Sequence, residues 1–216
     1  MASLWTENGP AYGLSWGDLR WTLDVDATIP GLLCEEATIG PLLALDGLSS
    51  PGRDEPRSLS GGSLIRHECR LNRVEALYQP SGWHSLRVRA TWTPRDVHIL
   101  DLELQLQADT VDEIMAVQAH VTSSCGVLLP SDPSRPSVTI REGSPNYLEM
   151  SHPDDTARID VIGSGKIRYG LLGYDLERGV VLRARLRGIW LANRPEVAEI
   201  SRQYQLFLDE PLPLGT

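Results

Sequence analysis

The chain has 216 residues, of which 41% are apolar and 23% are charged, and this balance is sufficient for a buried core. It excludes an intrinsically disordered chain, and no apolar run approaches the roughly 20 residues that a membrane-spanning helix needs. The formal net charge of -9 disfavours nucleic acid and anionic membranes, because binding to either requires a surplus of Lys and Arg. We therefore expect no nucleic-acid partner and no membrane partner.

Two long loops are predicted from clusters of turn-forming residues. The first covers residues 46–62 and contains two Pro, four Gly and four Ser. The second covers residues 130–146 and contains Pro130, Pro133, Pro136 and Pro145. Outside these loops apolar and polar residues alternate along much of the chain, which indicates strands with one buried and one solvated face.

The clearest strand is residues 85–92, and residues 97–107 are expected to return beside it as an antiparallel hairpin. The alternation slips by one residue between Ile99 and Leu100, which predicts a β-bulge at that point. In this hairpin two basic side chains are expected to face two acidic ones, namely Arg87 and Arg89 opposite Asp101 and Glu103.

Six further runs show the same alternation: residues 65–78, 138–141, 158–162, 167–175, 180–191 and 203–208. Residues 163–165 and 177–179 separate strands at hairpin length. Helical periodicity is confined to residues 110–120, which we assign mostly to strand, and to one possible turn over residues 195–202. The prediction is a single all-β domain over residues 1–216, an antiparallel two-sheet sandwich of about a dozen strands with little helix.

Cysteine and histidine usage indicates a cytoplasmic protein without a metal centre. Three cysteines, Cys34, Cys69 and Cys125, are an odd number at wide spacing, and no secretory segment follows Met1. We therefore expect reduced thiols. The five histidines show none of the short spacings of metal ligands, so we expect no metal and no cofactor.

Three arginines at period two, Arg183, Arg185 and Arg187, are the most specific feature of the sequence. On one strand face they would lie about 7 Å apart, where like charges repel unless they are neutralised. One possibility is that Asp101 and Glu103 neutralise them from a neighbouring strand. The other is a concave face that binds an anionic group such as a uronate or a phosphosugar.

Two histidines are also candidates for a site. His120 lies on the polar side of residues 117–122, where it is either a ligand-binding group or an ordinary half-exposed strand residue. His152 lies in the run of residues 151–155, SHPDD, which can place an imidazole near two carboxylates. The same run is also ordinary turn chemistry, because Asp and Pro favour turns.

Three segments together resemble the β-supersandwich domains of galactose-mutarotase-like proteins. They are GYDLERGVVLRARLRGIWL, LRVRATWTPRDVHILDLELQLQ and QYQLFLDEPLPLG, and the resemblance rests on strand rhythm over the last two thirds of the chain. Aldose epimerases of that superfamily use a His pair, an Asp and a Glu base. No matching His motif occurs here, so the resemblance implies a concave sheet for a sugar but no catalytic residue.

We therefore expect a protein that binds or modifies carbohydrate on a polar concave sheet face lined by Arg183, Arg185, Arg187 and His120. Its partner would be a saccharide or an anionic sugar. The alternative is a non-catalytic interaction domain that dimerises through a sheet face or edge, with its arginines paired internally. The first hypothesis needs an open polar cleft and the second a flat apolar patch. The sequence leaves open whether the protein is an enzyme.

Overall fold

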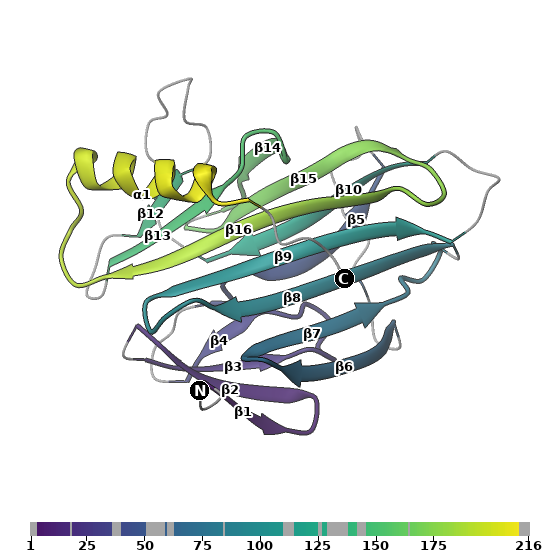
Figure 1. The fold of residues 1–216 in the computed structure, drawn as a ribbon, viewed down its shortest axis with the longest axis horizontal. Coiled ribbons are helices and arrows are strands. Elements are labelled where there is room, and N and C mark those ends of the chain that lie inside the picture. The colour runs from purple at the N-terminus through teal and green to yellow at the C-terminus, as the bar shows by residue number, and fades with distance from the viewer. Residues whose placement is uncertain are drawn as a thin grey trace.

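A computed structural model describes residues 4–17, 19–35, 40–50, 59, 63–83, 85–109, 115–124, 127–128, 138–141, 146–163 and 165–211. These residues form sixteen strands and one helix, and the strands build three antiparallel sheets (Figure 1). The all-β prediction with little helix is confirmed, although three sheets replace the expected two. No helix among the described residues is long and apolar enough to cross a membrane.

The three sheets are named A, B and C. Sheet A has the order β1 (Trp5–Asn8), β2 (Ala11–Trp16), β3 (Leu19–Asp24) and β4 (Leu32–Cys34). Sheet B has the order β14 (Thr156–Val161), β15 (Ile167–Leu176), β10 (Met115–Ser123) and β5 (Ala44–Ser49). Sheet C has the order β11 (Val127–Leu128), β12 (Val138–Arg141), β13 (Asn146–Ser151), β16 (Val181–Leu191), β9 (Ile99–Ala108), β8 (Leu86–Pro94), β7 (Arg73–Tyr78) and β6 (Leu64–Arg70).

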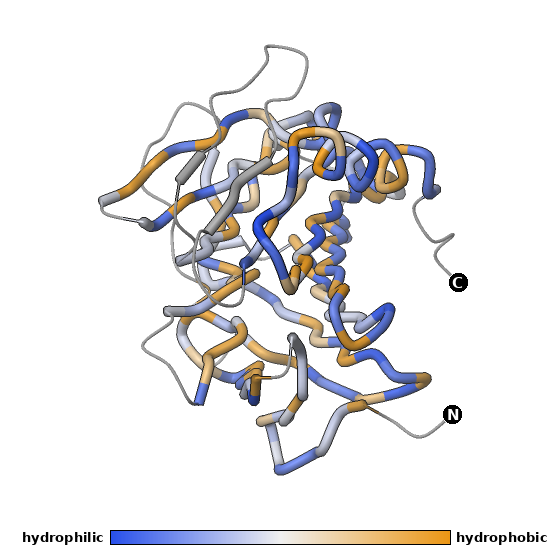
Figure 2. The backbone as a smooth tube through the Cα atoms, turned by 90° about the vertical axis from the view of Figure 1, so that its left-hand side faces the viewer, coloured by the Kyte–Doolittle hydropathy of each residue, from blue (hydrophilic) through white to orange (hydrophobic). Residues whose placement is uncertain are grey.

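One face of sheet C, here called the core face, packs against sheets A and B. Hydrophobic and hydrophilic residues alternate along the strands (Figure 2), and the buried apolar residues of all three sheets form one core cluster. Trp190 of β16 lies 5.4 Å from Trp16 and 5.6 Å from Trp21 between ring centroids, so it joins sheet C to sheet A. The Trp92 indole donates to the Leu43 carbonyl at 3.2 Å, at the start of sheet B. Trp21 and Trp190 are both buried in this core.

The opposite face of sheet C, here called the helix face, is covered by α1 (Val197–Asp209) (Figure 1). Ile200, Tyr204 and Phe207 recur at helical spacing and are buried on β13, β16 and β9. The prediction of a strand over residues 203–208 is therefore wrong. Its alternating pattern depended on Leu206, whose side chain is 52% exposed on the outer surface of the helix.

The β8–β9 hairpin is confirmed, but the predicted bulge is wrong. Its register runs without interruption from Leu86 opposite Ala108 to Pro94 opposite Leu100. Ile99 breaks the apolar alternation because it lies on the helix face, where α1 provides a second apolar cover. The apolar alternation slips at Ile99 because this part of β9 is buried on both faces.

Two other pairings also differ from expectation. Arg87 and Arg89 lie opposite Gln107 and Gln105, and their acidic partners are Asp109 and Glu75 at 2.7 and 3.4 Å. Residues 177–179 were expected at a hairpin, but they join β15 in sheet B to β16 in sheet C. Residues 163–165 do join a hairpin, between β14 and β15.

The segments expected as loops are described only in part. Residues 46–49, at the start of the first, belong to β5, and residues 51–58 and 60–62 lie outside the described residues. Within the second, residues 138–141 form β12, as predicted for that run, whereas residues 130–137 and 142–145 lie outside the description. Cys34 and Cys69 form no disulfide among the described residues, and Cys125 is not described.

Candidate functional site: a pocket at the end of the helix

The three arginines of β16 project from the helix face of sheet C. In register they lie opposite β9, with Arg183 beside Gln105, Arg185 beside Glu103 and Arg187 beside Asp101. Arg183 is half-buried, while Arg185 and Arg187 are buried beneath the last turn of α1. Their guanidinium carbons lie 4.6 and 5.3 Å from the centre of the Phe207 ring. The end of α1 therefore covers most of the ladder.

Arg187 is neutralised by carboxylates. Its Nε and Nη2 donate to the two oxygens of the fully buried Asp101 at 2.6 and 2.8 Å, and Nη2 also donates to Glu210 at 2.5 Å. Arg95 donates to Asp101 from the other side at 2.8 Å. Burial opposes the charge of Arg187, but the bonds and charge of Asp101 and Glu210 outweigh it and raise its pKa. This pairing through Asp101 is the internal neutralisation that the sequence offered as one possibility.

Arg185 caps the helix instead. Its Nη2 donates to the backbone carbonyls of Phe207 and Glu210 at 2.9 and 2.8 Å, where the last carbonyls of a helix lack partners. The last turn of α1 has no basic residue, so β16 supplies the positive charge that a helix C-terminus favours. Its Nε and Nη1 have no hydrogen-bond partner among the described residues. Burial lowers the pKa of Arg185, yet a guanidinium remains protonated at neutral pH.

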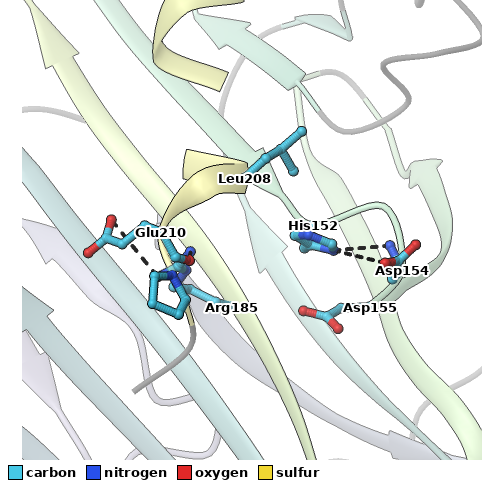
Figure 3. Close-up of a pocket in the computed structure, with 7 residues that line it drawn as sticks. His152, Asp154, Asp155, Arg185, Leu208 and Glu210 are labelled. Carbon is cyan, nitrogen blue, oxygen red and sulfur yellow. Dashed lines mark hydrogen bonds and ion pairs between the residues drawn. The ribbon is translucent and has the colours of Figure 1, made fainter. Parts of the chain in front are cut away.

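A pocket of about 260 Å³ lies beside Arg185 at the C-terminal end of α1. Its described lining residues are His152, Asp154, Asp155, Arg185, Leu208, Glu210 and Pro211. Figure 3 shows two walls. One consists of Arg185 with the end of the helix, and the other of the segment that carries His152, Asp154 and Asp155. The pocket therefore has a guanidinium on one side and an imidazole with two carboxyl groups on the other.

The second wall is a tight turn between β13 in sheet C and β14 in sheet B. The Asp155 amide donates to the His152 carbonyl at 3.2 Å, with Pro153 at the position where a fixed φ favours such a turn. The Thr156 hydroxyl donates to the His152 carbonyl at 2.8 Å, and it shares a second hydrogen bond of 2.8 Å with the Ser151 hydroxyl. These bonds fix the side chains of His152 and Asp155 on one wall.

The protonation of the pocket is set mainly by Asp155. Burial raises the pKa of this carboxyl, while the nearby charges of His152 and Arg185 oppose the rise. Asp154 is exposed, and its backbone amide donates to His152 Nδ1 at 3.3 Å. Asp155 thus faces the pocket as a group that accepts hydrogen bonds when ionised and can also carry a proton.

His120 lies elsewhere, on β10 in sheet B. It is fully buried, and its Nε2 is 2.7 Å from the hydroxyl oxygen of Ser49. Burial lowers its pKa to about 4, and the charges of Arg168 and Arg158 act in the same direction. Of the four predicted ligand-binding residues, the described lining of the pocket includes Arg185 and leaves out Arg183, Arg187 and His120.

The carboxyl group of Glu149 is also buried, and it lies on the core face of sheet C. The hydroxyl groups of Tyr147 and Ser123 donate to its Oε2 at 2.6 and 2.7 Å. Burial raises the pKa of Glu149, and these bonds only partly offset the effect. Among the described residues no group of three or more His, Cys, Asp or Glu side chains is placed to hold a metal ion.

The sequence analysis missed most of the pocket. It noted His152 beside two carboxylates but could not place that turn, and it assigned the residues before Glu210 to a strand. The signal that could have found the site was the helical spacing of Ile200, Tyr204 and Phe207, which brings Leu208 and Glu210 over β16.

No protein-family model and no curated protein sequence matches this chain. Among solved structures, it is similar to the heparan sulfate lyase HepC from Pedobacter heparinus, with a TM-score of 0.59 and 8% sequence identity. A mutant of the same lyase gives the same values. The alignment covers 91% of this chain and 38% of the lyase, so the chain spans well under half the length of that protein. At this identity the likeness shows a shared β-sandwich fold.

Proposed function

We propose that this protein binds a saccharide, and that the pocket of Arg185, His152 and Asp155 takes a neutral sugar ring. The observation that carries the proposal is the placement of a guanidinium, two of whose nitrogens make no hydrogen bond among the described residues, opposite a carboxyl group across one pocket. Neighbouring hydroxyl groups of a sugar each donate and accept a hydrogen bond, so they match a donor on one wall and an acceptor on the other.

The size and shape of the pocket also suit one ring. A volume of about 260 Å³ is just below the roughly 300–1,000 Å³ of pockets that hold drug-sized ligands. Asp155 accepts from one hydroxyl and the imidazole of His152 exchanges a hydrogen bond with the next. The donors that Arg185 would offer are Nε and Nη1, which are covered in this structure, so the proposal requires the guanidinium to turn toward the pocket when a sugar binds.

The charge balance favours a neutral sugar over an anionic one. Three carboxyl groups, those of Asp154, Asp155 and Glu210, line the pocket beside the single guanidinium of Arg185. Asp101 and Glu210 are bonded to Arg187, which leaves Asp154 and Asp155 as the two carboxyl groups that face Arg185 in the pocket. A uronate or a phosphosugar would therefore meet more negative than positive charge, on a protein whose net charge is already -9.

The structural comparison supports carbohydrate as the ligand class at the level of the fold. The similar structure is, by its title, a heparan sulfate lyase, and part of its chain has this β-sandwich arrangement. Fold alone does not establish function. The proposal therefore depends on the pocket.

Titration calorimetry tests the proposal with two panels. Glucose, galactose, mannose and xylose form the neutral panel, and glucuronate, glucose 6-phosphate and heparan sulfate oligosaccharides form the anionic panel. We expect at least one neutral sugar to bind, and Asp155→Asn to weaken it by roughly ten- to a hundredfold, because a hydrogen bond to a charged group is lost. Asp160→Asn is the matched control, since Asp160 lies on β14 and pairs with Arg158 at 3.1 Å.

Two results would count against the proposal. If no neutral sugar binds at millimolar concentration, or if Asp155→Asn binds as well as the unmutated protein, the pocket is not a sugar site. Tighter binding of the anionic panel would reverse the charge argument and favour the arginine ladder as an anion site.

A further inference from the structure

Tyr174 of β15 is the one aromatic residue of the chain with an exposed side chain. All thirteen aromatic residues lie in the described parts of the chain, and eleven of them are buried. Trp83 is partly buried against the core, whereas Tyr174 is 54% exposed. Because nearly all other aromatic rings of this chain are buried, the exposed ring of Tyr174 is an exception, and its position can indicate a binding surface.

Tyr174 is bonded to the turn that forms one wall of the pocket. Its hydroxyl donates to the backbone carbonyl of Asp154 at 2.6 Å, and Asp154 lines the pocket. The bond engages the polar end of the side chain and restricts the ring, while more than half of the side chain remains in solvent. A tyrosine held in this way presents a rigid apolar surface.

The backbone before Tyr174 is shaped to place it there. β15 has two residues, Gly173 and Tyr174, opposite the single Val117 of β10, which is the arrangement of a β-bulge. Leu172 has φ of 67° and Gly173 has φ of 97°, so a leucine adopts the left-handed region that favours glycine. The Leu172 amide donates to the Asp155 carbonyl at 2.7 Å. The bulge thus holds the pocket wall through two bonds, one to Asp154 and one to Asp155.

From this placement we infer that Tyr174 is the stacking platform of a second sugar subsite, so that the natural ligand is an oligosaccharide or the end of a polysaccharide chain. The inference rests on the proposed function of the pocket. A neutral sugar ring has an apolar face of C–H groups, and such a face packs on an aromatic ring. One ring occupies the pocket between Arg185 and Asp155, and the adjacent ring of the same chain lies on Tyr174.

The test compares a monosaccharide with its disaccharide on the unmutated protein. The pairs are glucose with cellobiose, mannose with mannobiose and xylose with xylobiose, each measured by calorimetry. We expect the disaccharide to bind about tenfold more tightly, which corresponds to about 1.4 kcal/mol and to the upper range of aromatic contacts. Tyr174→Ala should abolish this difference, and its monosaccharide affinity should match that of Tyr174→Phe, which lacks the same bond to Asp154.

Two further variants separate the ring from its hydrogen bond and from general surface effects. Tyr174→Phe keeps the ring and loses the bond to Asp154, so it should retain part of the disaccharide advantage. Val161→Ala is the control, because Val161 is 58% exposed on β14 of the same sheet and does not line the pocket. It should behave as the unmutated protein. Thermal melting of each variant confirms that it is folded.

The outcomes distinguish the subsite from the pocket. If a monosaccharide binds but its disaccharide binds equally well, or if Tyr174→Ala keeps the tenfold difference, the subsite is refuted and the saccharide pocket stands. If no member of any pair binds, both the pocket and the subsite are refuted.

Discussion

Replacing Asp101 by alanine should destabilise the protein more than any exposed ion-pair substitution. Asp101 is fully buried on the helix face of β9, and it accepts two hydrogen bonds from Arg187 and one from Arg95. Its removal leaves Arg187, itself 6% exposed, with only the Glu210 bond among the described residues. Loss of one partner from a buried ion pair typically costs about 3–5 kcal/mol, because the remaining charge is desolvated without compensation.

Asp109 provides a matched control in the same hairpin. It pairs with Arg87 at 2.7 Å, a distance similar to that between Asp101 and Arg187, but its side chain is 41% exposed. Exposed pairs contribute at most about 1 kcal/mol, because solvent screens the charges. For a chain of this size each kcal/mol changes the melting temperature by roughly 2–4 °C. We therefore expect Asp101→Ala to lower Tm by about 6–20 °C and Asp109→Ala by at most about 4 °C.

Urea unfolding followed by tryptophan fluorescence measures the two free energies of unfolding under one set of conditions. Removing Arg187 together with Asp101 should cost less than the sum of the two single substitutions, since no unpaired charge then remains in the interior. Equal losses for Asp101→Ala and Asp109→Ala would refute the argument that burial determines the contribution of this pair.

Two buried groups should make stability depend on pH in opposite directions. The unfolded state binds a proton at the His120 position near its usual pKa of 6.5, but the folded state does so only at about 4, so stability should fall by up to about 3 kcal/mol as the pH drops through that window. His120→Gln should remove this contribution in urea titrations at pH 7 and 4.5, and an unchanged acid profile would contradict it. Glu149 has a raised pKa, so its folded form holds the proton more tightly and stability should decline as the pH rises above about 4.5. Glu149→Gln cannot ionise and should gain stability relative to the unmutated protein at pH 8 compared with pH 5, whereas parallel profiles would show that Glu149 does not titrate in this range.

The strands were predictable because their alternation reflects a physical cause. In β8 the residues Leu86, Val88, Ala90 and Trp92 enter the core, while the side chains between them are left less buried. In β10 the same alternation places Val117, Ala119 and Val121 in the core cluster, although the residues between them, such as His120, are buried as well. A strand that packs on apolar residues with only one of its faces shows an apolar residue at every second position of its sequence.

The errors arose where a second neighbour covered the other face. Ile99 was apolar on the side expected to be polar because α1 packs there, and the sequence offered a bulge as the only local explanation. The helix itself was mistaken for a strand because Tyr204, Leu206 and Leu208 also fit a period of two. Periodicity over six residues does not separate the two structures when one extra apolar residue is exposed.

The candidate site depended on that same helix. Arg185 could be placed on a strand face, but its hydrogen bonds end on the carbonyls of Phe207 and Glu210, which exist as a helix terminus only once α1 has formed. Asp155 joins it from a turn more than twenty residues earlier in the chain. No local pattern relates these residues, because the pocket is created by the crossing from sheet C to sheet B beside the end of α1.

The position of the pocket follows from how sheet C is covered. Its core face is buried against sheets A and B, so polar groups there, such as Glu149, are removed from solvent. Its helix face is covered by α1, whose last buried residue, Phe207, stacks over Arg185 and Arg187. Beyond Phe207 the helix ends, and the turn that carries His152 and Asp155 rises on the other side. The pocket beside Arg185 therefore lies where the helix stops, and a ligand recognised by Arg185 must enter at that end.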